Sequence, residues 1–77
     1  MPERLHDLEA ALLDAHRAED GRRIAELYAE AGRRAQSSGQ RDRASFYLVH
    51  AYVFALQEGM ELAGDLHAQL KAMGREI

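Results

Sequence analysis

The feature that most constrains this chain is the stretch Ala44–Leu56, ASFYLVHAYVFAL, in which only Ser45 and His50 are plainly polar. It holds four of the five aromatic residues in the sequence. A helix that is apolar all round has no face to present to water. We therefore expect other helices, a second copy of the chain or a partner to cover this stretch on several sides.

The stretch is predicted to be helical. Its valines and aromatic residues would also fit a buried strand, because periodicity does not separate the two in so apolar a run. Its thirteen residues are long for a strand, however, and no second segment offers a strand to pair with it. Ala44, Ala51 and Ala55 also favour a helix.

Three further segments repeat apolar residues at helical spacing, so the fold class is predicted to be all-α. The four helices are expected at about 3–18, 21–37, 41–58 and 60–73. Turns of two to four residues would make them antiparallel neighbours, in a hairpin array or a small bundle. Residues 1–77 should form one domain, which at this length buries only roughly 60% of its unfolded surface. Association of subunits is therefore one route to stability.

The helix boundaries are predicted from turn residues and caps. Asp20-Gly21 should end the first helix, with Asp20 capping the second. Gln40 and Asp42 both precede the apolar run of the third helix, and Asp42 has the better chemistry for a cap. Gly59 and Gly74 should end the last two helices in the left-handed conformation that glycine tolerates. Gly64, inside the fourth helix, indicates either a close neighbour or a tolerated weakness.

Small and large residues alternate in a regular way across the second and third helices. The pattern reads Tyr28-x2-Ala31-Gly32-x2-Ala35, then Ala44-x3-Leu48-x2-Ala51. Small residues at Gly32, Ala44 and Ala51 would let two helices approach closely, while Tyr28 and Leu48 would fill the space between hairpins. Over residues 25–58 this pattern resembles one tetratricopeptide repeat. Leu56 stands where that family usually has proline, and Ala35 where it usually has an aromatic residue.

The resemblance implies a scaffold that binds another protein or a peptide on the concave surface made by the first helix of each hairpin. Arg33 and Lys71 would be placed there to bind a carboxylate. Carried over by position, the partner-binding surface would comprise Glu26, Ala29, Arg33, Gln36, Ser37, Glu61, Gly64, Ala68 and Lys71. The predicted function is a tetratricopeptide-like protein interaction module.

A second stripe on the apolar helix points away from its hairpin partner. It must meet the first helix, the fourth helix or another subunit. The stripe consists of Phe46, Val49, Val53 and Leu56, with Tyr52 at its edge. A small homo-oligomer of structural or regulatory role is therefore an alternative function, with these five residues as the oligomer interface.

The sequence carries no motif that predicts catalysis, a cofactor or a metal site. It lacks a glycine-rich phosphate loop, zinc-ligand spacing and a Ser/His/Asp set in a suitable context. Only Glu3-x2-His6 matches the carboxylate–histidine spacing of di-iron bundles, and it lies in the first turn of a helix. His50 is expected to be a core histidine satisfied by a tyrosine, a carbonyl or water, with an interface role as the alternative. The chain is not expected to be an enzyme.

Charge distribution leaves one further alternative. The net charge is −3, yet residues 22–43 hold six arginines against Glu26, Glu30 and Asp42. We expect the acidic first helix beside this segment, with Arg22/Glu26 and Glu30/Arg34 pairs on a solvated face. Binding of nucleic acid or another polyanion through this segment is the less favoured reading.

The sequence also bears on the cellular location of the protein. The longest apolar run falls short of the ~20 residues that span a bilayer. The acidic N-terminal segment does not resemble a secretory signal, and there is no cysteine. We expect a cytoplasmic protein without membrane partners.

Overall fold

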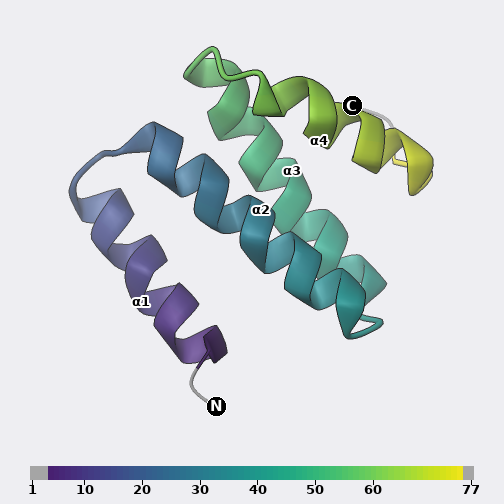
Figure 1. Cartoon of the computed structure of the whole chain (residues 1–77), viewed down its shortest axis with the longest axis horizontal. Helices are drawn as coiled ribbons and strands as arrows, with labels where there is room; N and C mark the ends of the chain where they lie inside the picture. The colour runs from purple at the N-terminus through teal and green to yellow at the C-terminus, as the bar shows by residue number, and fades with distance from the viewer. Residues whose placement is uncertain (1–3, 76–77) are drawn as a thin grey trace.

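The computed structural model describes the backbone of residues 4–75, and their side chains from Asp7 onward. It contains four helices, α1 (Arg4–Arg17), α2 (Gly21–Ser37), α3 (Arg41–Gln57) and α4 (Leu62–Ala72), and no strand within the described residues (Figure 1). The predicted all-α class is thereby confirmed. The predicted start of the first helix at residue 3 lies outside the described residues.

All four helices end in the same way. The backbone N–H of the third residue past each helix reaches back to a carbonyl five residues earlier, for example Gln40 N–H to Ala35 O at 2.9 Å and Met60 N–H to Ala55 O at 2.9 Å. This bond needs a left-handed residue just before it. Gly39, Gly59 and Gly74 fill that position with φ of 75°, 66° and 81°, so the predictions for Gly59 and Gly74 are confirmed.

The turn from α1 to α2 uses a different residue from the one predicted. Glu19, with φ of 53°, takes the left-handed position, and Gly21 is already the first residue of α2. Asp20 does cap α2, because its Oδ1 accepts a hydrogen bond from Arg23 N–H at 3.2 Å. The predicted start of the second helix at residue 21 and the Asp20 cap are both confirmed, although α1 already ends at Arg17, before Asp20-Gly21.

The starts of α3 and α4 also differ from the prediction. Gln40, not Asp42, is the N-cap residue of α3, and its side chain makes no capping hydrogen bond. Asp42 lies within the first helical turn and is ion-paired with Arg75 instead. Helix α4 starts at Leu62, because the first bond after the turn joins Ala63 N–H to Met60 O, a tighter i,i+3 bond.

Helices α2 and α3 form the most extensive interface, and small residues bring them together. A Cβ atom added to Gly32 would lie 2.6 Å from Leu48 Cδ2, far inside van der Waals contact. Ala44, Leu48 and Ala51 have no exposed surface. Leu48 therefore packs against Gly32 of α2, and the buried Ala44 and Ala51 are consistent with the close approach that the sequence pattern predicts.

The core is built largely from alanine. Three leucines, one on α3 and two on α4, are its large fully buried side chains. The cluster comprises Ala25, Ala29, Leu48, Ala51, Ala55, Ala63, Leu66 and Leu70. A core of small side chains lets the helices lie close, which limits the apolar area each can bury.

The helices form an open array, not a closed bundle. Each packs extensively only on its neighbours in the chain, α1 on α2, α2 on α3 and α3 on α4 (Figure 1). The Cα atoms span 30 × 29 × 14 Å, so the array is thin in one direction. One side of α3 is consequently left without a covering helix.

Candidate binding face on α3

Helix α3 has a buried side and an outer side, although its sequence is apolar almost all round. Its inner residues Ala44, Leu48, Ala51 and Ala55 are fully buried. On the outer side, Phe46 is 56% exposed, Val53 43% and Leu56 55%. We call the stripe of Phe46, Val49, Val53 and Leu56 the outer face of α3.

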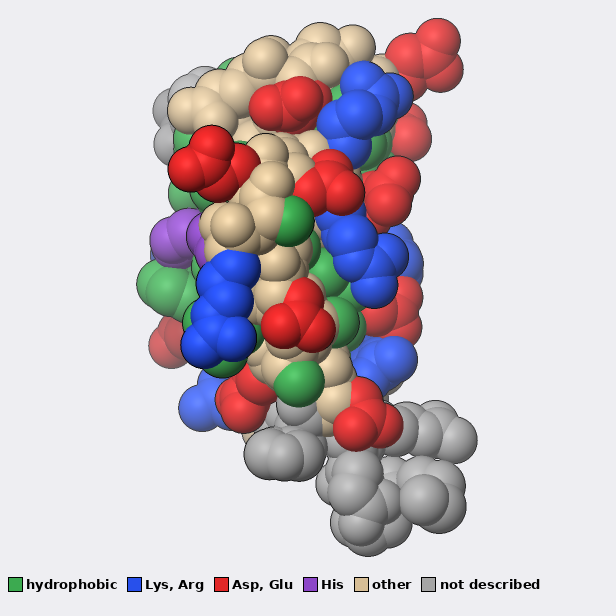
Figure 2. Space-filling view, turned by 90° about the vertical axis from the view of Figure 1, so that its left-hand side faces the viewer, with side chains coloured by type: hydrophobic (Ala, Val, Ile, Leu, Met, Phe, Trp, Pro, Cys, Tyr) green, Lys and Arg blue, Asp and Glu red, His purple; other side chains and the backbone are tan. Residues whose placement is uncertain are grey.

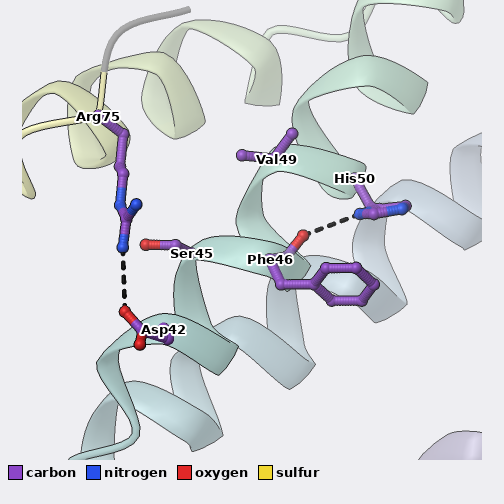
Figure 3. Close-up of a pocket in the computed structure, with 6 residues that line it drawn as sticks. All are labelled: Asp42, Ser45, Phe46, Val49, His50 and Arg75. Carbon is purple, nitrogen blue, oxygen red and sulfur yellow. Dashed lines mark hydrogen bonds and ion pairs between the residues drawn. The ribbon is translucent and has the colours of Figure 1, made fainter.

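A groove runs beside the N-terminal half of this face. It has a volume of about 510 Å³ and is open to solvent (Figure 3). Phe46, Val49 and His50 come from the middle of α3, while Arg75 lies in the segment after α4. The lining residues are Asp42, Ser45, Phe46, Val49, His50 and Arg75.

An ion pair lies at one end of the groove. Arg75 Nη2 donates to Asp42 Oδ1 at 3.2 Å, and close by Arg41 Nη2 donates to Met73 O at 3.0 Å. Both contacts join the start of α3 to the C-terminal end of α4, so α4 runs back along α3. The Asp42 side chain is fully exposed and that of Arg75 is 46% exposed, so the pair contributes little to stability.

Ser45 is the buried polar residue of the groove. It is 5% exposed, and its Oγ has no hydrogen-bond partner within the described residues. Figure 3 shows its side chain between Asp42 and Val49, on the side of α3 that Arg75 approaches. An unpartnered buried hydroxyl costs free energy, and few native groups are left in that state.

His50 is half-buried at the other end of the groove. Its Nδ1 lies 2.9 Å from Phe46 O, and since a carbonyl only accepts, Nδ1 carries the proton and donates (Figure 3). Its ring lies 4.3 Å from that of Phe46 and 5.2 Å from that of Tyr28, measured between centroids. The carbonyl partner is one that the sequence analysis expected, but the residue borders the outer face.

The two remaining residues of the predicted oligomer interface are less accessible. Val49 is half-buried and packs against the core as well as lining the groove. Tyr52 is half-buried and stacks on His67 of α4, with ring centroids 5.5 Å apart. The accessible part of the stripe is thus Phe46, Val53 and Leu56, with Val49 between them.

The residues of the predicted concave surface differ in accessibility. Ala29 is 2% exposed and belongs to the core. Helices α2 and α4 have no extensive interface with each other. A Cβ at Gly64 would meet no atom within 4 Å, so no neighbour explains that glycine. The other predicted residues are exposed: Glu26, Arg33, Gln36, Ser37, Glu61, Ala68 and Lys71.

Four of the six arginines of the middle segment, Arg22, Arg33, Arg34 and Arg41, donate side-chain hydrogen bonds to nearby acceptors. Glu30 holds two of them, Arg33 Nη2 at 2.6 Å and Arg34 Nε at 2.9 Å. The hydrogen bond from Arg33, and then that from Arg34, hold the pKa of Glu30 below its ordinary value. Arg22 donates to Glu58 O at 3.4 Å, so the predicted Arg22/Glu26 pair is not the contact formed.

Helix α1 packs on α2, as expected. On the side of the molecule formed by α1, acidic and basic side chains are mixed. Figure 2 shows acidic and basic side chains interspersed there, with no broad area of one sign. A polyanion would favour a continuous basic surface. This face does not provide one.

The described histidines do not assemble a metal site. His16 contacts the rings of Tyr28 and Phe54, and in residues 7–75 no three His, Asp or Glu side chains converge as metal ligands. Glu3 and His6 lie outside the described side chains. In the part of the chain that the structure describes, no helix is long and apolar enough to cross a membrane.

No family model, curated protein or solved structure matches the chain.

Proposed function

We propose that this chain is a non-catalytic helical module, located in the cytoplasm, that binds another protein chain through the outer face of α3. The observation that carries the proposal is the exposure of Phe46, Val53 and Leu56 in one line on a helix. Scattered apolar residues are normal on a surface, but large ones aligned on one helix face are typical of helix-in-groove recognition. Covering them would contribute about 25 cal/mol for each Å² of apolar surface removed from water.

The groove beside the face supports the same proposal. Phe46 and Val49 supply its apolar wall, and the Asp42–Arg75 pair with His50 supplies polar groups at its ends. An apolar centre with a polar rim is the usual anatomy of a protein interface. Among the groove residues Ser45 Oγ has no hydrogen-bond partner within the described residues, His50 Nδ1 donates to Phe46 O and Asp42 pairs with Arg75, so no nucleophile–base pair is formed and we propose binding and not catalysis.

The tetratricopeptide-like character remains part of the proposal, as a description of the hairpin. The close approach at Gly32 and the burial of Ala44 and Ala51 support it. The family's concave surface would be formed by α2 and α4, whereas the binding face proposed here belongs to α3. We favour α3 because it carries three large exposed apolar residues, Phe46, Val53 and Leu56, while the exposed residues of α2 and α4 are mostly charged or small.

Site-specific photocrosslinking in the native cells tests this function. A benzophenone amino acid would replace Phe46 in one variant and Ala68 in another, since both positions are exposed but only the first lies on the face. We expect ultraviolet light to give one or a few covalent protein adducts, identified by mass spectrometry, at position 46 and none at position 68. The absence of adducts at position 46, or the same adducts at both, would contradict the proposal.

A further inference from the structure

The outer face has the spacing of a two-helix seam. Phe46, Val49, Val53 and Leu56 follow one another at intervals of three, four and three residues. This alternation keeps apolar side chains facing a partner helix along its length, with a mean repeat of 3.5 residues. A second helix laid on this face would therefore contact all four residues.

The face is also complementary to itself. Its four residues are placed symmetrically about Ala51, so a second α3 running in the opposite direction would set Phe46 against Leu56 and Val49 against Val53. A two-fold interface requires one patch to fit its own copy in this way. We propose that the occupant of the outer face is a second copy of this chain, with the two α3 helices antiparallel. This inference rests on the proposed function and names its partner.

The groove fits this arrangement. It lies against Phe46 and Val49, at the end of the face that Leu56 of the second copy would reach. Leu56 is 55% exposed and is free to project from α3. An isobutyl side chain entering the groove would bury both its own surface and the exposed ring of Phe46.

Charge at the two ends of α3 favours the antiparallel direction. The end near Phe46 carries Arg41, Arg43 and Arg75 against Asp42. The end near Leu56 carries Glu58 and Glu61, with Arg22 reaching the Glu58 carbonyl. Antiparallel helices place the basic end of one beside the acidic end of the other, and align their dipoles favourably. A parallel pair would place like ends together.

The test uses opposite charges at the two paired positions. In a dimer of two identical variant chains, the lysine of Phe46→Lys would lie against Leu56, and the glutamate of Leu56→Glu would lie against Phe46. Each variant alone should therefore lose its self-association. In an equimolar mixture, the antiparallel pair sets the new lysine against the new glutamate and leaves the other contact native. We expect sedimentation velocity to show dimer for the wild type at high concentration, monomer for each variant, and dimer again for the mixture.

The matched controls carry the same charges away from the face. Ala10→Lys and Ala10→Glu lie at an exposed position on α1, and should leave the wild-type association unchanged. Circular dichroism confirms that each variant keeps its helices, which the exposure of both mutated positions leads us to expect.

Several results would overturn the inference. They are a wild type that stays monomeric at every concentration, single variants that still dimerise, or a mixture that remains monomeric while both variants are folded. The first of these, together with photocrosslinks from position 46 to a different protein, would remove the self-association but leave the proposed function standing. Monomeric wild type without any crosslink from position 46 would remove both.

Discussion

At the scale of single residues, Gly32 and Gly64 both lie inside helices but in different surroundings. We expect Gly32→Ala to destabilise the fold by about 1–3 kcal/mol, because its methyl group would meet the fully buried Leu48 side chain. Gly64→Ala should stabilise it by up to about 1 kcal/mol, since alanine is the better helix former and the space is open. Urea denaturation followed by circular dichroism measures both, and an equal gain at the two positions would contradict the close approach of α2 and α3.

Glu30 provides a residue-scale prediction about pH. Its pKa is lowered from 4.5 in the folded state by Arg33 and Arg34, so its ionised form stabilises the fold above the unfolded-state pKa. That contribution is lost as the pH falls through the lower, folded-state value. Glu30→Gln should therefore cost a few tenths of a kcal/mol at pH 7, as expected for exposed pairs, and nothing at pH values below the folded-state pKa.

Unfolding free energies measured for both proteins from neutral to acidic pH check this prediction. Glu26→Gln is the matched control, because Glu26 forms no ion pair with a described residue. A difference between wild type and Glu30→Gln that stays constant with pH would show that the arginine contacts do not depend on the carboxylate charge.

At the scale of the helices, the N-cap residues of α2 and α3 differ in a testable way. Asp20→Ala should destabilise the protein by about 1 kcal/mol, because it removes the acceptor for Arg23 N–H at the start of α2. Gln40→Ala should change stability much less, since the Gln40 side chain makes no capping bond at the start of α3. The thermal midpoints of the two variants report the difference, and equal losses would argue against the Asp20 cap.

Most helix boundaries follow from local chemistry, and for that reason the sequence predicts them. Gly59 and Gly74 end helices because a left-handed residue is needed there, and Asp20 caps because it is a short acceptor. The errors arise where no residue type is decisive. Glu19 adopts the left-handed conformation despite its side chain, and Gln40 occupies a cap position without capping.

At the scale of the whole molecule, the exposed stripe could be predicted but the groove could not. Phe46, Val53 and Leu56 share one side of a helix by spacing alone, so the sequence identifies them before any packing is known. The groove depends on contacts such as Asp42 to Arg75, which are 33 residues apart in the chain. No local pattern in the sequence signals such a contact. None predicts that Ser45 Oγ is buried without a hydrogen-bond partner among the described residues.

The open order of the helices, in which each packs extensively only on its sequence neighbours, also governs how the chain folds and opens. Contacts between neighbouring helices close short loops, so folding should be rapid, as in other proteins dominated by local contacts. Opening should start at the ends, because α1 packs extensively only on α2, while the α2–α3 hairpin has the most extensive interface. The α2–α3 hairpin should therefore be the last part of the chain to open. Pairing of two chains through α3 would slow its opening further.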